Sequence, residues 1–348
     1  MQFLLLIFGL VMIIKSADIL IDSSSKIARR YGVSSFIIGI TVVAFGTSAP
    51  ELAVGIVSGI NRANQLTLGN IIGSSLSNIA LIVGLAAVIF PLEVKDTIVK
   101  RELPLLLIIQ IALGAMMFLD GHISRIEGLI LLGSFVLFML YISRDARKSI
   151  IIHFDTDGDI DTDANINTEG EINTGADIDT GENGIGIPSQ SESEQKNAGL
   201  IKLWCYSLLS LAGLFIGGKL TVDSSTHIAQ SFGLSETLIG LTVVALATTM
   251  PELITSIVAA RKKEPEIVLG NCIGSNIFNI LLVLGFSSVI HPISSDRGLW
   301  MDVLVMLALT LFVFIMSMLH KKLKRRTGIL LLAGYTAYLT FKIISALG

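Results

Sequence analysis

Two segments of this chain repeat each other at a constant offset of 201 residues. Both pairs align without gaps, and they match in prolines and polar residues, such as Pro50 with Pro251 and Glu51 with Glu252. Chance similarity between apolar helices would not produce these matches, so the pattern indicates a duplicated unit. The pairs are "GITVVAFGTSAPELAVGIVSG" (39–59) with "GLTVVALATTMPELITSIVAA" (240–260), and "LGNIIGSSLSNIALIVGL" (68–85) with "LGNCIGSNIFNILLVLGF" (269–286).

The composition places this duplicated unit in a membrane. The 348 residues are 52% hydrophobic and 15% charged, with a mean hydropathy of +0.76. Soluble domains are nearer 25% charged, and a membrane-spanning helix needs about 20 apolar residues. The sequence predicts an all-α polytopic membrane protein with ten spans: 2–22, 34–60, 66–90, 103–119, 124–142, 201–221, 235–260, 266–290, 299–319 and 327–347.

The basic residues predict the orientation of these spans. Seventeen Lys and Arg residues fall in loops on one side and three (Arg62, Arg125 and Arg297) on the other. The positive-inside rule then places both termini outside and the long central loop in the cytoplasm. Because each copy holds five spans, an odd number, the second copy enters the membrane from the opposite side. We therefore expect two inverted five-helix repeats, 1–142 and 201–348, whose repeat motifs cover 39–85 and 240–286, joined by a linker over 143–200.

Each repeat carries a proline beside a carboxylate in the middle of a span. Pro50 has no N–H, so the carbonyl of Gly46 loses its helical partner, and Pro251 does the same to Ala247. Freed carbonyls within a membrane must line a cavity or bind something. A charged group at this depth is costly and marks a functional site. Broken helices from two inverted repeats typically meet at the substrate site of a secondary transporter, near the bilayer midplane.

The helix after each break adds further polar side chains. Asn70, Ser74 and Asn78 are four residues apart and share one helical face, with Asn271, Ser275 and Asn279 as their copies. Asn70 and Asn271 suit either ion contact or hydrogen bonding between helices, and the two serines are alternatively small packing residues. Every candidate ligand is an oxygen, which suits Ca²⁺, and two Glu residues match its charge.

These motifs resemble those of the calcium/cation antiporter superfamily, specifically the prokaryotic type of sodium/calcium exchanger. The shared pattern is G-T-S-x-P-E followed by G-N-x-x-G-S-x-x-x-N, and A-T-T-x-P-E followed by G-N-x-x-G-S-N-x-x-N. The resemblance covers nearly all ten spans and leaves out only the central loop. It implies exchange of Ca²⁺ for Na⁺ across the cell membrane by alternating access, with the first and sixth helices sliding across the rest.

The resemblance also implies a role for each motif residue. Glu51 and Glu252 bridge the ions, Thr47 and Thr248 offer carbonyls to Ca²⁺, and Ala44 and Ala245 offer carbonyls to Na⁺. Ser48, Thr249, Ser74 and Ser275 complete the sodium sites around Asn78 and Asn279. Some relatives carry Asp at one of these two central positions, whereas here both are Asn. The implied protein is no enzyme, needs no cofactor besides the transported ions, and functions as a monomer without nucleic acid.

Other transport modes fit the same residues. A buried Glu can carry H⁺ as readily as Na⁺, so a Ca²⁺ or other cation/H⁺ antiporter is the alternative, and a passive cation channel is disfavoured because it has no need of two inverted copies of the motif. Residues 155–194 hold 12 acidic residues and no Lys or Arg, which favours a disordered linker over weak attraction of calcium. We also expect Lys15 and Asp18 to form an ion pair on a helix surface.

Overall fold

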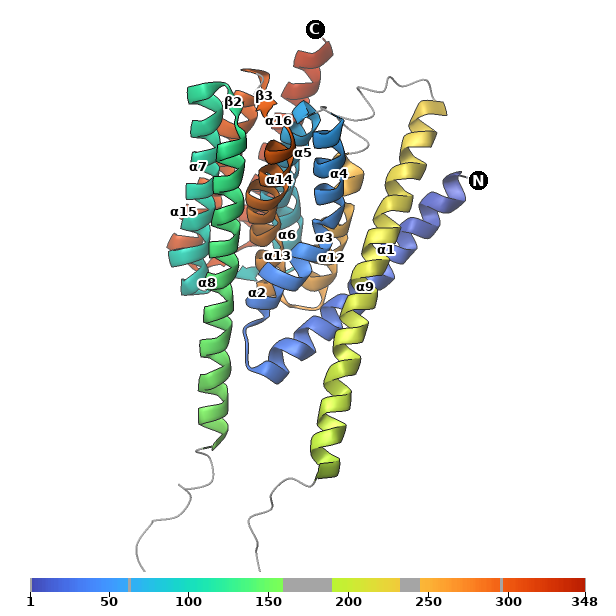
Figure 1. Ribbon diagram of the computed structural model, residues 1–348, viewed down its shortest axis with the longest axis vertical. Coiled ribbons are helices and arrows are strands. Elements are labelled where there is room, and N and C mark those ends of the chain that lie inside the picture. Colours follow the sequence, from blue (N-terminus) through green and yellow to red (C-terminus); the bar gives the residue numbers. More distant parts are fainter. Residues whose placement is uncertain (1, 62–63, 159–189, 232–244, 295–296, 348) are drawn as a thin grey trace, which may run out of the picture.

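The computed structural model describes residues 2–61, 64–158, 190–231, 245–294 and 297–347, and it is helical almost throughout (Figure 1). The first half contains α1 (Gln2–Tyr31), α2 (Ser35–Ile38), η1 (Gly39–Val43), α3 (Ala44–Thr47), α4 (Ala49–Ile60), α5 (Asn64–Leu76), η2 (Ser77–Ile82), α6 (Val83–Ile89), β1 (Leu92–Glu93), η3 (Ile98–Glu102), α7 (Leu103–Asp120), β2 (His122–Ile123) and α8 (Arg125–Gly158). The second half contains α9 (Gln190–Ser231), α11 (Ala245–Thr248), α12 (Met250–Arg261), α13 (Pro265–Phe278), η5 (Asn279–Leu284), α14 (Gly285–Ile290), β3 (Ile293–Ser294), η6 (Arg297–Leu299), α15 (Trp300–His320), β4 (Lys322–Leu323) and α16 (Arg325–Leu347).

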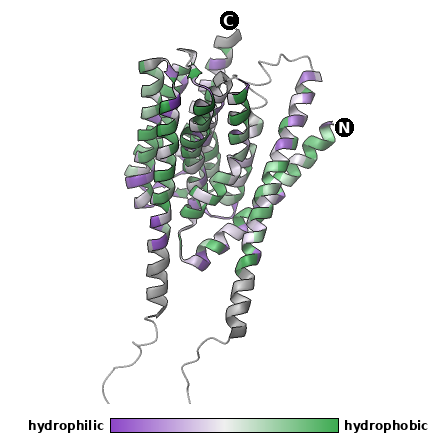
Figure 2. Cartoon of the chain, viewed as in Figure 1, coloured by the Kyte–Doolittle hydropathy of each residue, from purple (hydrophilic) through white to green (hydrophobic). Residues whose placement is uncertain are grey.

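Several of these helices are long and apolar enough to cross a bilayer. Among the described residues seven single helices qualify, and an eighth span is formed if the bent pair 35–47 and 49–60 counts as one. Their outer surfaces carry exposed large hydrophobic side chains such as Leu4 and Leu119, and Figure 2 shows hydrophobic residues along the outer helices. A water-soluble protein would not leave so much apolar surface uncovered. The chain is therefore an all-helical polytopic membrane protein.

The buried centre of the bundle is built from the repeated motifs. The whole apolar stretch of the Pro265–Ile290 span is buried within the protein, and so is 78% of the corresponding stretch in Thr67–Ile89. Small residues allow close contact here, because a Cβ on Gly274 would lie 2.8 Å from the Ile40 carbonyl oxygen. The polar motif residues are thus held inside the protein, away from lipid.

Three helices extend past the expected span ends. Helix α1 continues to Tyr31 instead of ending at 22, α8 continues to Gly158, and α9 begins at Gln190. The ends of the expected 143–200 linker are therefore helical. The remaining linker residues 159–189, and residues 232–244 of the expected seventh span, lie outside the described residues.

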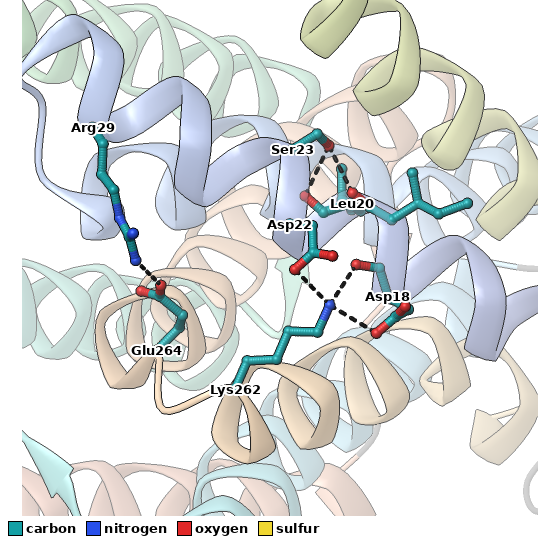
Figure 3. Close-up of polar contacts among 8 residues, drawn as sticks. Asp18, Leu20, Asp22, Ser23, Arg29, Lys262 and Glu264 are labelled. Carbon is teal, nitrogen blue, oxygen red and sulfur yellow. Dashed lines mark hydrogen bonds and ion pairs between the residues drawn. The ribbon is translucent and has the colours of Figure 1, made fainter.

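The expected ion pair between Lys15 and Asp18 is replaced by a longer-range contact. The Lys262 ammonium group lies 2.7 Å from a carboxylate oxygen of Asp18 and 2.7 Å from one of Asp22, while Arg29 pairs with Glu264 at 3.3 Å (Figure 3). The acidic residues of α1 thus pair with the turn between α12 and α13, because α1 crosses the bundle there.

Two short antiparallel strand pairs connect the halves of the chain. β1 pairs with β4, with Leu92 opposite Leu323, and β2 pairs with β3, with Ile123 opposite Ile293. Backbone groups of a loop in the first half therefore form hydrogen bonds with backbone groups of a loop in the second half.

Candidate functional site

The two prolines break their helices where the sequence predicts. The segment 35–47 meets α4 at a bend of 46°, with Pro50 in the first turn of α4. Across this break Ser48 N–H donates to the Ala44 carbonyl and Leu52 N–H donates to the Ser48 carbonyl, and neither bond uses the Gly46 or Thr47 carbonyl. In the second half Leu253 N–H donates to the Thr249 carbonyl, as Leu52 does to Ser48.

The two breaks lie together beside α9. A Cβ on Gly218 would lie 3.4 Å from Cγ of Pro251 and 3.9 Å from Cγ of Pro50, so one point of α9 touches both prolines. A hydrogen bond also joins the breaks directly, because the Ser48 hydroxyl donates to Oε1 of Glu252 at 3.2 Å. Residues 201 positions apart in the sequence therefore build one site.

The two carboxylates are enclosed at this site. Glu51 is 0% exposed and Glu252 is 1% exposed, and each lies in the first turn of its helix, α4 or α12. The N-terminal end of a helix carries partial positive charge, which stabilises a nearby carboxylate. Both oxygens of Glu51 and Oε2 of Glu252 nevertheless have no hydrogen-bond partner. Buried unpartnered carboxylate oxygens are costly unless a cation binds them.

The two central amides also present free oxygens. Nδ2 of Asn78 donates to Oδ1 of Asn276 at 2.9 Å, and Nδ2 of Asn279 donates to the Ser74 hydroxyl at 3.1 Å. Oδ1 of Asn78 and Oδ1 of Asn279 have no partner, although both residues are at most 1% exposed. Both asparagines lie in the first two positions of a π-helical segment, η2 or η5. Such segments are frequent at functional sites, because they turn a side chain out of the regular helix.

The hydroxyl groups connect these elements. Thr47 Oγ1 lies 3.0 Å from Oδ1 of Asn271 and 3.4 Å from the Ser275 hydroxyl. In the other half Thr248 Oγ1 donates to Oδ1 of Asn70 at 3.5 Å. The amides of Asn70 and Asn271 therefore bond between helices, one of the two roles that the sequence leaves open for them.

Eleven of the twelve expected site residues are buried near the two breaks or on the helices that follow them: Ala44, Thr47, Ser48, Glu51, Ser74, Asn78, Thr248, Thr249, Glu252, Ser275 and Asn279. Ala245 begins α11, and its side chain lies outside the described part of the chain. The Ala44 carbonyl accepts the Ser48 N–H at 3.0 Å and lies 3.3 Å from the Thr47 hydroxyl, so Thr47 would have to turn its hydrogen elsewhere for this oxygen to bind a sodium ion.

Two residues of the hydrogen-bond network are absent from the predicted set. Asn276 holds the amide of Asn78, and Ser256 accepts a hydrogen bond from Nδ2 of Asn271 at 3.0 Å. The signal for both is a difference between the repeats, because Asn276 aligns with Ser75 and Ser256 aligns with Gly55. A search for matching residues selects what the repeats share and passes over such differences.

This arrangement is suited to a hard cation. Five oxygens without hydrogen-bond partners come from two carboxylates and two amides, and the Ser48 hydroxyl contacts one of the carboxylates. Within the described ranges there is no cluster of three or more His, Cys, Asp or Glu residues that would hold a resident metal of another type. An all-oxygen set with two negative charges fits Ca²⁺ or, with fewer ligands each, more than one Na⁺.

Comparison with known proteins identifies the family. The family model described as sodium/calcium exchanger protein matches residues 1–144 and 202–344. The chain belongs to the sodium/calcium exchanger family. The match omits the central segment and includes both repeat motifs, in agreement with the extent of the resemblance found in the sequence.

Individual relatives cover almost the whole exchanger chain. It is 34% identical over 337 residues to the inner membrane protein YrbG of Escherichia coli, covering 96% of this chain and 94% of that protein. It is 33% identical over 340 residues to the sodium/calcium exchanger MaX1 of Methanosarcina acetivorans, covering 97% of each. Among solved structures, the sodium-calcium exchanger NCX_Mj soaked with 10 mM Na⁺ superposes with a TM-score of 0.77 at 29% identity, covering 97% of this chain and 98% of that one. The exchanger is thus a multi-pass membrane transporter and not an enzyme.

Proposed function

We propose that the exchanger moves Ca²⁺ in one direction and Na⁺ in the other, binding them in turn at the site between the two prolines. The observation that carries this proposal is the pair of buried carboxylates, Glu51 and Glu252, contributed by different halves of the chain and surrounded by neutral oxygens. Two negative charges balance one Ca²⁺ or two Na⁺, so either ion load makes the buried site electrically neutral. The site can then change its exposure without moving a large net charge through a low-dielectric interior.

Strand pairing supports two inverted five-helix repeats. A shift of 201 residues carries Leu92 to Ile293, and a shift of 200 carries Ile123 to Leu323. These shifts convert the pair Leu92–Leu323 into the pair Ile293–Ile123, which is the other strand pair of the molecule. Each repeat therefore contributes equivalent strands to the two pairs, as a two-fold relationship between the repeats requires.

Two close glycine contacts are related by the same shifts of 201 and 200 residues. A Cβ on Gly328 in α16 would lie 2.6 Å from the Gly84 carbonyl oxygen in α6, and a Cβ on Gly128 in α8 would lie 3.0 Å from the Gly285 carbonyl oxygen in α14. In Figure 1 the two termini lie toward one end of the molecule, while the C-terminal end of α8 and the N-terminal end of α9 lie toward the other. This placement of the chain ends supports the proposal that each half crosses the membrane an odd number of times, with ten spans in total.

Alternating access at this site requires a moving part, and we assign it to α1 and α9. These two helices pack against each other through Gly9 and Gly217, where a Cβ on either glycine would lie 3.0 Å from the carbonyl oxygen of the other. The Ser207 hydroxyl donates to that of Ser23 at 2.8 Å, and Gly218 covers both prolines. A pair with small residues on its inner face can slide across the breaks and expose the ions to each side in turn.

The remaining organisation follows from the basic residues of the loops. We propose a cell-membrane protein with both termini outside, repeats at 1–142 and 201–348, and a cytoplasmic acidic connection between them. The complete site is built from one chain, so we propose that the monomer is the functional unit.

The direct experiment is calcium uptake into proteoliposomes that contain the purified exchanger. Vesicles loaded with Na⁺ and diluted into Na⁺-free medium should accumulate Ca²⁺, whereas vesicles without an ion gradient should not. Uptake driven equally well by a proton gradient in the absence of Na⁺ would replace the proposal with Ca²⁺/H⁺ exchange. Uptake without any counter-ion gradient would indicate a channel.

A further inference from the structure

The two central asparagines occupy equivalent positions but have partners that are not equivalent. Asn279 donates its amide hydrogen to Ser74, at 3.1 Å. The equivalent bond in the other half would run from Asn78 to Ser275. Asn78 instead donates to Oδ1 of Asn276, at 2.9 Å. One amide therefore bonds to the hydroxyl of a site serine and the other does not.

A single sequence difference between the repeats explains this asymmetry. The first repeat reads "GSS" over 73–75 and the second reads "GSN" over 274–276, so Asn276 aligns with Ser75. Ser75 is fully buried and its hydroxyl has no partner. A serine side chain at this position does not provide the acceptor that the longer amide of Asn276 provides for Asn78.

The bond to Asn276 leaves the hydroxyl of Ser275 in a different state from that of Ser74. Ser74 accepts the amide of Asn279 and donates to the Ile71 carbonyl at 3.2 Å, so its hydrogen and one lone pair are both in use. Ser275 has no contact with an asparagine amide among the described hydrogen bonds. Its recorded partner is Thr47, 3.4 Å away.

The direction of the Thr47 bond follows from its neighbours. Asn271 donates Nδ2 to Ser256 at 3.0 Å, which fixes its Oδ1 as an acceptor. The Thr47 hydroxyl donates its single hydrogen to this Oδ1, at 3.0 Å, or to the Ala44 carbonyl, at 3.3 Å, and both are acceptors. Thr47 can then only accept from Ser275. Ser275 gives away its hydrogen and keeps both lone pairs, which are what a bound cation needs.

We propose that Asn276 is a positioning residue that makes the two sodium-binding serines inequivalent, because Ser275 keeps both lone pairs for a cation whereas Ser74 uses one to support Asn279. Asn276 does this by accepting the amide hydrogen of Asn78, so that Asn78 does not bond to the Ser275 hydroxyl. The same bond leaves Oδ1 of Asn78 without a hydrogen-bond partner. The inference rests on the proposed function and deepens it, because it assigns sodium binding mainly to the α13 side of the site. Calcium, held chiefly by the two carboxylates, depends on Asn276 much less.

The test compares ion-dependent thermal stabilisation of the purified protein, since a ligand that binds the native state raises Tm by an amount that grows with the logarithm of its concentration relative to Kd. Asn276→Ser gives the second repeat the residue of the first, and Asn78 should then turn to Ser275. We expect the Na⁺ concentration for half-maximal stabilisation to rise about tenfold or more, as for other lost supporting partners of metal ligands. The Ca²⁺ concentration for half-maximal stabilisation should change by less than about threefold.

Two matched variants separate positioning from general damage. Asn276→Gln keeps an amide oxygen as an acceptor for Asn78 without adding charge, and it should retain Na⁺ dependence closer to that of the wild type than Asn276→Ser does. Ser75→Ala alters the equivalent position of the other repeat and should have little effect on either ion. Equal weakening of Na⁺ and Ca²⁺ binding in Asn276→Ser, or a wild-type response to Na⁺, would overturn the proposal.

A second pair keeps the inference testable if Asn276→Ser does not fold. Ser275→Ala should weaken Na⁺ stabilisation clearly more than Ser74→Ala, and equal losses would contradict the inequivalence. Different results would contradict the proposed function and the role of Asn276. A wild-type protein that neither ion stabilises and that shows no exchange removes the proposed function itself, whereas normal exchange with equivalent serines removes only the role of Asn276.

Discussion

The ammonium group of Lys262 lies 2.7 Å from the carboxylate of Asp22 and ties the proposed sliding helix α1 to the turn between α12 and α13. Asp18 shares the same ammonium group at 2.7 Å. Partial burial lowers the pKa of Lys262, but the hydrogen bonds and charges of the two aspartates outweigh this effect and raise it. The contact is therefore complete at neutral pH and is lost only as the pH rises through that raised pKa.

This contact predicts that a fixed tether between α1 and the turn will stop transport. In Asp22→Cys/Lys262→Cys, a short bifunctional methanethiosulfonate, which joins the two cysteines through disulfides, should abolish exchange, and a reducing agent should restore it. Lys262→Cys alone, treated with the same reagent, controls for modification of Cys205 and Cys272. Full exchange by the cross-linked protein would show that α1 does not move relative to α12 and α13.

The glycine contact between the halves predicts a clear difference between two similar substitutions. Gly328→Leu places a side chain against the backbone of Gly84, where a Cβ already comes within 2.6 Å. Overpacking of this kind costs about 1–3 kcal/mol, so Tm in detergent should fall. Gly133→Leu is the control, because a Cβ on Gly133 meets nothing within 4 Å. Similar Tm values for both variants would mean that α6 and α16 do not pack as described.

The site was more predictable from the sequence than the helix ends were. Pro50 and Pro251 break their helices for a local reason, the missing N–H, which no tertiary contact can supply. The end of α1 also has a local signal, because Gly32 lies at φ +63° directly after Tyr31 and the Val33 N–H bonds back to the Ala28 carbonyl, but the expected end at 22 followed hydropathy instead. Apolar residues stop near 22, but the helix continues to Tyr31 because hydropathy marks the membrane boundary and not the end of helical hydrogen bonding.

Ion pairs between residues far apart in the chain could not be predicted from the sequence, for a different reason. Asp18 is three residues from Lys15, yet it pairs with Lys262, because the path of α1 across the bundle decides which charges meet.

A third feature that the sequence does not reveal is a helix end. The offset between the repeats changes from 201 to 200 after β3, so that Gly121 corresponds to Lys321. Both residues end their helices at positive φ, which only glycine signals in a sequence.

The distribution of basic residues predicts the orientation of the chain. An epitope tag inserted in the 159–189 segment should be protected in right-side-out vesicles, and a tag after Gly348 should be accessible to antibody. The control is permeabilisation, which should expose both tags equally. Finding both tags on the same side would contradict the odd number of spans in each repeat.

The free oxygen of Asn279 predicts how the site responds to a third negative charge. Asn279→Asp removes the hydrogen that is donated to Ser74 and adds a third carboxylate to the proposed ion site. Repulsion between like charges favours uptake of a proton or an additional cation. Na⁺-driven Ca²⁺ exchange should therefore become more sensitive to pH between 6 and 9, or respond to K⁺. Identical profiles for the variant and the wild type would place Asn279 outside the ion site.

The central claim is that Glu51 and Glu252, from different halves of the chain, form a single ion site. The most direct measurement is Na⁺-gradient-driven Ca²⁺ uptake by Glu51→Gln and by Glu252→Gln, reconstituted at equal protein amounts. Each change removes one of the two charges that balance Ca²⁺, so we expect uptake to fall to the level of empty liposomes in both variants. Glu93→Gln, which alters an exposed carboxylate paired with Lys322, should transport normally. Wild-type uptake by either site variant, in folded protein, would contradict the shared site.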